Sequence, residues 1–182
     1  MSDDDSLKVA LSPSMEAYIL HWGEMGPQWG VNRTVAQIHA LLWIWDEALD
    51  ADSIAATLGV ARSNVSNSLR ELRDWGLVKP ANALGRRKEL FTADKDPWEV
   101  FLQVLRERRK REIEPTLKAL RGFVAMAEKE KSPEAAGARK RMLELSELME
   151  QLCAIHDTAS ALPPALLRKA LKGGKILSIF KS

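Results

Sequence analysis

The chain contains one cysteine, Cys153, and only three histidines among its 182 residues. A single thiol excludes an internal disulfide and a metal site with several thiolate ligands within one chain. His21, His39 and His156 lie far apart in sequence and form no His-x-x-x-His pair, so each is expected to be a packed or surface side chain. We therefore expect no metal and no cofactor.

Long apolar runs are also absent, because no stretch approaches the roughly 18 apolar residues of a membrane span. Residues 1–5 are acidic where a secretory signal would be basic, so we expect a cytoplasmic protein without membrane contact. The chain has no Gly-x-Ser-x-Gly motif, and Gly173-Gly174-Lys175 lacks the spacing of a phosphate-binding loop. An enzyme is therefore not expected.

The net charge of +2 hides an uneven distribution of charge along the chain. Residues 62–88 contain seven basic and two acidic residues, a net charge of +5, whereas residues 1–52 contain two basic and nine acidic residues, a net charge of −7. A basic segment beside an acidic one fits phosphate binding, because neutralised phosphates release counterions and so supply affinity for nucleic acid.

The basic segment follows the pattern of two short helices joined by a tight corner. Asp50 can cap the first helix, and Gly59 ends it at a position where glycine turns without steric cost. In the second helix Val65, Leu69 and Leu72 recur at spacings of four and three, which predicts one buried stripe. The sequence therefore predicts a helix-turn-helix.

The opposite face of the second helix carries short polar and basic side chains. Arginine can bind a guanine edge through two hydrogen bonds, asparagine can bind adenine in the same way, and serine is small enough for close approach to bases and phosphates. We predict that this face binds double-stranded DNA. Its residues are Arg62, Ser63, Asn64, Ser66, Asn67, Arg70 and Arg73.

After the second helix the pattern changes to that of a hairpin. Residues 77–79 and 89–92 predict strands, and residues 82–85 predict the turn between them. Together they predict a two-stranded wing with a cationic tip. The basic residues expected to contact phosphate or the minor groove are Arg86, Arg87 and Lys88.

A set of short motifs runs through this region: Leu58-Gly59-Val60, Arg62-Ser63-Asn64-Val65-Ser66, Ser68-Leu69-Arg70-Glu71-Leu72, Trp75-Gly76-Leu77-Val78 and Gly85-Arg86-Arg87-Lys88-Glu89. With Met25-Gly26-Pro27 upstream, they resemble the winged helix-turn-helix of the MarR family of transcriptional regulators, and most closely its GbsR branch. The resemblance implies a dimeric DNA-binding regulator, by analogy a repressor. One departure is Ala61, where such proteins usually place a serine cap, whose loss costs about 1 kcal/mol.

Two helices are expected before the helix-turn-helix. Ser12 should cap the first, and Gly23, Gly26 and Pro27 should end it. The second is expected over residues 32–47 and is apolar on almost every side, which predicts a central helix.

Tryptophans gather in this half of the chain, at Trp22, Trp29, Trp43 and Trp45. Filling the core is their ordinary role, and a ligand pocket is the alternative. The GbsR branch is similar in pattern to regulators of choline and glycine-betaine metabolism, and a quaternary ammonium group binds aromatic faces within about 6 Å. The resemblance therefore implies a possible small-molecule effector of this class.

The chain beyond Asp96-Pro97 is expected to be helical, with Pro115 kinking or splitting one long helix and Ser132-Pro133 starting another over residues 134–162. Apolar residues in the last helix alternate at spacings of three and four, as in a coiled-coil seam. Such a seam can close a bundle within the chain, but two recognition helices are needed on one duplex, so we assign it to a homodimer. The seam residues are Leu145, Leu148, Leu152, Ile155, Ala159 and Leu162.

The expected fold class is mainly α with a small β-wing. Two domains are predicted: a winged helix-turn-helix DNA-binding domain with its amino-terminal helices over residues 1–95, and a helical dimerisation region over residues 96–182. The predicted function is that of a sequence-specific DNA-binding transcriptional regulator. Because a fold alone does not define a function, a winged helix that binds proteins and not DNA is the alternative.

Overall fold

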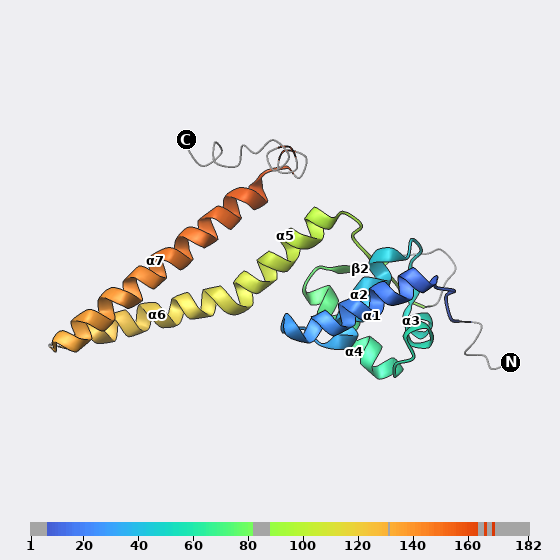
Figure 1. Cartoon of the computed structure of the whole chain (residues 1–182), viewed down its shortest axis with the longest axis horizontal. Coiled ribbons are helices and arrows are strands. Elements are labelled where there is room, and N and C mark those ends of the chain that lie inside the picture. Colours follow the sequence, from blue (N-terminus) through green and yellow to red (C-terminus); the bar gives the residue numbers. More distant parts are fainter. Residues whose placement is uncertain (1–6, 82–87, 131, 164–165, 167–168, 170–182) are drawn as a thin grey trace. The chain divides into compact units, whose positions relative to one another are not determined.

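The structure is a computed structural model that describes residues 7–81, 88–130, 132–163, 166 and 169 (Figure 1). The chain divides into two compact units, residues 1–103 and 104–182. The elements are α1 (Pro13–Gln28), α2 (Arg33–Ile44), β1 (Leu49–Asp50), α3 (Ala51–Leu58), α4 (Arg62–Asp74), β2 (Val78–Ala81), β3 (Leu90–Ala93), α5 (Pro97–Arg108), the π-helical turn η1 (Arg109–Ile113), α6 (Glu114–Ala127) and α7 (Pro133–Ala161). The fold is therefore mainly α with a small sheet, as predicted.

Helix α1 begins where the sequence indicates, because the Met15 amide donates to Ser12 Oγ at 3.4 Å. Gly23 and Gly26 do not end the helix as predicted, since it continues through both to Gln28, one residue beyond Pro27. Both glycines are buried in α1, whose main neighbour is α2 (Figure 1). Packing against a second helix outweighs the low helix propensity of glycine, which is a preference of only about 1 kcal/mol per residue.

Helix α2 is the central helix of the first unit. Val35, Ile38, Leu41 and Leu42 are almost completely buried. The helix ends at Ile44 rather than at residue 47, and its last carbonyl groups accept hydrogen bonds from the ammonium group of Lys95, including Leu42 O at 2.7 Å. A cation at this position complements the negative end of the helix dipole.

The helix-turn-helix forms as predicted. The side chain of Asp50 accepts a hydrogen bond from the Ser53 amide at 2.7 Å and so caps α3. Gly59 ends α3 with φ at +63°, a left-handed conformation that glycine adopts without strain. Helix α4 then begins at Arg62 without any side-chain hydrogen bond from Ala61, in agreement with the missing cap.

The wing is part of a three-stranded antiparallel sheet with the order β1-β3-β2. In β2 and β3, Val78 pairs with Ala93 and Ala81 pairs with Leu90. The sequence predicted these two strands but missed β1, in which Asp50 pairs with Leu90. A strand of two residues is too short to show alternation, yet this pairing places the start of α3 beside the base of the wing.

In the second unit, the break predicted at Pro115 is present as the π-helical turn η1, which immediately precedes α6. Proline lacks an amide hydrogen, so it disturbs the regular hydrogen bonding of the preceding turn. Helix α7 begins at Pro133, where Ser132 Oγ accepts from the Ala135 amide at 3.1 Å. Helices α6 and α7 lie antiparallel (Figure 1), and no helix in the described residues has the length and apolar character to cross a membrane.

Candidate nucleic-acid interface

Helix α4 separates apolar and polar residues onto opposite faces. Val65, Leu69 and Leu72 are buried, as the sequence predicted, and Ser68 is buried beside them. The side chains that were predicted to bind DNA point toward solvent, although Ser66 is half-buried. Those that are exposed are Arg62, Ser63, Asn64, Asn67, Arg70 and Arg73. The structure therefore places every predicted residue of this helix on an accessible face.

Neighbouring polar side chains on α4 are hydrogen-bonded to each other. Arg70 donates to the side-chain oxygen of Asn67 at 2.9 Å. The Arg62 guanidinium donates to Ser66 Oγ, which itself donates to the backbone oxygen of Arg62 at 3.1 Å. These contacts hold the side chains in defined positions on a helix surface. The Arg62 and Arg70 side chains retain further N–H groups, because a guanidinium carries five.

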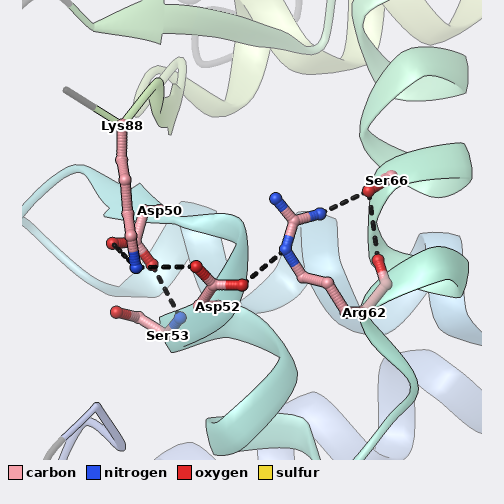
Figure 2. A network of polar contacts seen from close by, with 6 residues as sticks. All are labelled: Asp50, Asp52, Ser53, Arg62, Ser66 and Lys88. Atoms are coloured by element: carbon pink, nitrogen blue, oxygen red, sulfur yellow. Dashed lines mark hydrogen bonds and ion pairs between the residues drawn. The ribbon is translucent and has the colours of Figure 1, made fainter.

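The largest polar network links the start of α3, the start of α4 and the base of the wing. Figure 2 shows Asp52 between Lys88 and Arg62. Lys88 Nζ lies 2.7 Å from one carboxylate oxygen of Asp52, and Arg62 Nε lies 2.6 Å from the other. Asp50 lies farther from Lys88, at 3.9 Å. One carboxylate therefore joins two cations that belong to different elements.

The contacts in this network shift the pKa values of Asp52 and Lys88. The hydrogen bond from Lys88, and then the one from Arg62, hold the pKa of the Asp52 carboxyl below its ordinary value. The same hydrogen bond to Asp52, followed by the charge of Asp50, raises the pKa of Lys88. Both shifts favour the charged forms, so the network is ionic at neutral pH.

A second ion pair joins α4 to the wing. Arg73 lies 3.0 Å from Glu89, which immediately precedes β3. At the other end of the strands, Lys79 of β2 lies 3.6 Å from Asp94. Arg62, Arg73 and Lys88 thus have carboxylate partners within the protein, and none of these acids was predicted to be part of the site. No local signal reveals such pairs, because Asp52 and Lys88 are 36 positions apart in the chain.

The expected wing tip lies partly outside the described residues. Arg86 and Arg87 belong to this undescribed segment, and their DNA contacts stay predictions. Lys88 is described, is exposed and is held at the base of the wing by Asp52. Within the described residues, the cations of the interface therefore come from α4 and from Lys88.

Four aromatic residues of the first unit, Tyr18, Trp22, Trp29 and Trp43, form a connected group. Tyr18 stacks on Trp43 with ring centroids 5.9 Å apart and contacts Trp22 edge-on at 5.8 Å. Trp22 in turn contacts the exposed Trp29 at 5.0 Å. Tyr18 was not among the residues predicted for the pocket, although its ring joins Trp22 and Trp43. Trp45 belongs to no ring pair among the described residues, so the predicted set is brought together only in part.

Two indole nitrogen atoms near the end of α2, Trp43 Nε1 and Trp45 Nε1, are buried without a hydrogen-bond partner. The rings of the aromatic group contact each other at the distances that aromatic pairs prefer, which is the behaviour of a packed cluster. A ligand pocket in this region stays a prediction.

Among the described residues, no group of three or more His, Cys, Asp or Glu side chains is arranged to hold a metal ion.

The predicted seam residues of α7 are apolar and largely exposed. Leu145, Leu148, Leu152 and Ile155 are each about half accessible, and Leu162 just beyond the helix is half-buried. A different face of α7 packs on α6, where Ala135 and Ser146 are buried. These four side chains therefore do not close a bundle within the second unit, which was the alternative to a dimer. Ala159 lies outside the side chains that the structure describes.

Comparison with solved structures shows a similarity of fold. The chain is similar to a solved structure described as a transcriptional regulator, with a TM-score of 0.56 and 18% sequence identity over 80% of this chain and 99% of that one. The two proteins share a fold. A transcriptional regulator from Thermotoga maritima is also similar, at a TM-score of 0.37 and 17% identity over 78% of this chain and 92% of that chain. No family model and no curated protein matches the sequence.

This shared fold agrees with the elements described above. An exposed α4 follows a capped α3 and a glycine corner, and a β2–β3 hairpin comes next, as in a winged helix-turn-helix. The predicted fold class is thus confirmed.

Proposed function

We propose that this protein is a dimeric, sequence-specific DNA-binding transcriptional regulator of the MarR type, in the GbsR branch, and that it acts as a repressor. The observation that carries the proposal is the exposed polar face of α4 on a winged helix fold. The apolar residues of α4 are buried, so packing needs nothing from the Arg, Asn and Ser side chains on the other face. Donors of these types on an accessible helix suit the major groove.

In this proposal the two parts of the interface have different tasks. Asn64, Asn67 and Arg70 lie on the exposed face of α4 and read base edges. Lys88, with the predicted Arg86 and Arg87, contacts phosphate and so positions the protein without reading sequence. The net charge of +5 over residues 62–88 supports a role of this segment in phosphate binding.

We propose that the second unit forms the homodimer through one side of the α6–α7 hairpin. Its two sides differ in chemistry. One side carries ion pairs between the helices, Arg121 with Glu150 at 2.7 Å and Arg139 with Glu128 at 3.9 Å. The other side carries no such pairs among the described residues, and most of the exposed large apolar side chains of the two helices lie there: Phe123, Met126, Leu145, Leu148, Leu152 and Ile155.

A second copy of this chain is the occupant that fits the apolar side. The apolar residues of α7 repeat at three and four, which is the spacing of self-associating helices, and a two-fold axis lets the same side chains meet each other. A dimer also places two recognition helices on one duplex, about 34 to 36 Å apart. Leaving these apolar side chains in water is unfavourable by the hydrophobic effect.

The proposed effector is a quaternary ammonium compound such as choline, bound by the aromatic group around Tyr18 and Trp43. The support is the set of aromatic rings in mutual contact with Trp29 exposed at one end, together with the family resemblance. Such a ligand releases DNA only if it binds the DNA-free dimer more tightly than the DNA-bound dimer.

One observation favours the alternative, a winged helix that binds protein and not DNA. Arg62, Arg73 and Lys88 are each paired with a carboxylate of the protein, which lowers the positive potential at the interface. The two functions are separated by a mobility-shift titration with DNA from upstream of its own gene and with a random duplex of equal length. We expect tighter binding of the upstream DNA and a steep loss of affinity with salt. Lack of binding to either duplex at about 50 mM salt would favour the protein-binding alternative.

A further inference from the structure

We propose that the carboxylate of Asp52 occupies, in the DNA-free protein, the place that a backbone phosphate takes between Lys88 and Arg62 when DNA binds. This inference rests on the proposed DNA-binding function and deepens it. It assigns one phosphate-binding site to two named cations and gives Asp52 a role in setting the affinity.

The geometry at Asp52 matches that of a bound phosphate. The two carboxylate oxygens are shared between Arg62 Nε at 2.6 Å and Lys88 Nζ at 2.7 Å. A phosphodiester also presents two terminal oxygens, and Arg and Lys bind carboxylate and phosphate with the same donors. A phosphate can therefore replace the carboxylate without a new arrangement of the two cations.

The site is open to an incoming group. The side chains of Arg62, Lys88 and Asp52 are 50%, 55% and 35% exposed. Figure 2 shows that they come from the start of α4, the base of the wing and the first turn of α3. In a winged helix bound to DNA, the recognition helix and the wing are the parts that approach the duplex, so a site between them faces the DNA backbone.

The neighbouring acid, Asp50, has a different task. Its side chain is only 13% exposed, and one of its oxygens accepts the α3 capping hydrogen bond from Ser53. Its other oxygen lies 3.9 Å from Lys88. Asp50 therefore stays in place and keeps the lysine ammonium near the site, while Asp52 is the carboxylate that a phosphate displaces.

An exchange of this kind lowers the affinity for every DNA sequence. Two cations that are already paired with a carboxylate gain less binding free energy from a phosphate than two solvated cations do. The displaced Asp52 carboxylate also repels the phosphate. Asp52 thus acts as a positioning residue that assembles the site and restrains non-specific binding.

The test compares full-length proteins binding a random-sequence duplex, measured by fluorescence anisotropy over a range of salt concentrations. The test variant is Asp52→Asn. The matched control is Asp74→Asn, which removes the same charge from the exposed end of α4. At about 0.1 M salt, we expect Asp52→Asn to bind about five-fold more tightly than the control, with a salt dependence steeper by about one unit.

A double-mutant cycle with Lys88→Gln separates exchange from a general charge effect. We expect Lys88→Gln to weaken binding about three-fold more in the Asp52→Asn background than in the wild type, because only there is the ammonium released from Asp52. Equal affinities of the two Asn variants, or additive effects in the cycle, would overturn the role of Asp52 while leaving DNA binding intact. Absence of DNA binding by every variant and the wild type would instead overturn the proposed function, and the inference with it.

Discussion

A methyl group on Gly26 of α1 would lie 2.9 Å from Cβ of Ala36 in α2. It would also lie 3.2 Å from the backbone oxygen of Val31. Carbon atoms pack at about 3.5 to 4.0 Å, so this approach is possible only without a side chain at position 26. At Gly23 the corresponding neighbour is the flexible side chain of Gln37, at 2.6 Å, which can move more easily.

Gly26→Ala is therefore expected to lower the free energy of unfolding by about 1 to 2 kcal/mol, because overpacking exceeds the gain in helix propensity. Gly122→Ala in α6 is the matched control, since nothing lies within 4 Å of its added Cβ. That change should raise stability by about 0.5 to 1 kcal/mol. Urea unfolding measures both, and a stabilising Gly26→Ala would contradict the close packing of α1 on α2.

Acid should destabilise the protein through His39. Burial, and then the nearby charge of Lys95, lower the pKa of His39 from 6.5 to about 4, and its Nε2 has no hydrogen-bond partner. The unfolded chain therefore binds the proton first as pH falls. The contribution of neutral His39 is complete above pH about 6.5 and is lost toward pH 4, a change of about 3 kcal/mol.

Urea unfolding at several pH values between 4 and 7 tests this prediction for His39. His39→Phe should reduce the loss of stability in this pH window, because no proton can be taken up at that position. His21→Phe is the control, since His21 is exposed, and it should keep the pH dependence of the wild type. The same pH dependence in His39→Phe and wild type would refute the role of His39.

Leu152→Glu should convert the proposed dimer to a monomer and greatly weaken operator binding. Leu152 is 57% exposed on the apolar side of α7, so the charge becomes buried only in the dimer. Leu143→Glu is the control because Leu143, at 37% exposure, lies about two turns from Glu150 on the ion-pair side. Light scattering gives the mass of each protein, and a monomeric wild type at micromolar concentration would end the dimer proposal.

Two substitutions should affect DNA binding in different ways. Asn67→Ala on the exposed face of α4 should cost about 1 to 3 kcal/mol on the preferred site and little on random DNA. Arg87→Ala in the predicted wing tip should weaken all sequences similarly and reduce the salt dependence by about one unit. Anisotropy titrations with both duplexes measure these effects. Unchanged affinities for both variants would show that DNA meets a different surface.

Choline should quench tryptophan fluorescence saturably and weaken operator binding if the aromatic group holds a cation. Trp43→Ala should reduce both effects, because Trp43 stacks on Tyr18 within the group. Tyr18→Phe keeps the aromatic ring and should retain binding. Titration calorimetry that detects no heat with choline or glycine betaine at millimolar concentration would exclude this class of effector.

The local features of the fold were the predictable ones. The Asp50 cap, the Gly59 corner and the buried stripe of α4 depend on residues within one or two helical turns, so spacing in the sequence is enough to identify them. The exposed polar face of α4 follows from the same periodicity. The π-helical turn before Pro115 was also foreseeable as a break, because proline removes a donor whatever surrounds it.

Sequence by itself determined the helix-turn-helix, the basic segment and the apolar repeat of α7, since each depends on residues that are close together in the chain. Tertiary structure decided that Gly23 and Gly26 lie inside α1, that Tyr18 joins the tryptophans and that Asp52 lies between Lys88 and Arg62. The continuation of α1 depends on its packing against α2, and the place of Asp52 depends on the pairing of β1 with β3. Contacts between residues this far apart arise from packing the chain as a whole, and no spacing within a single segment encodes them.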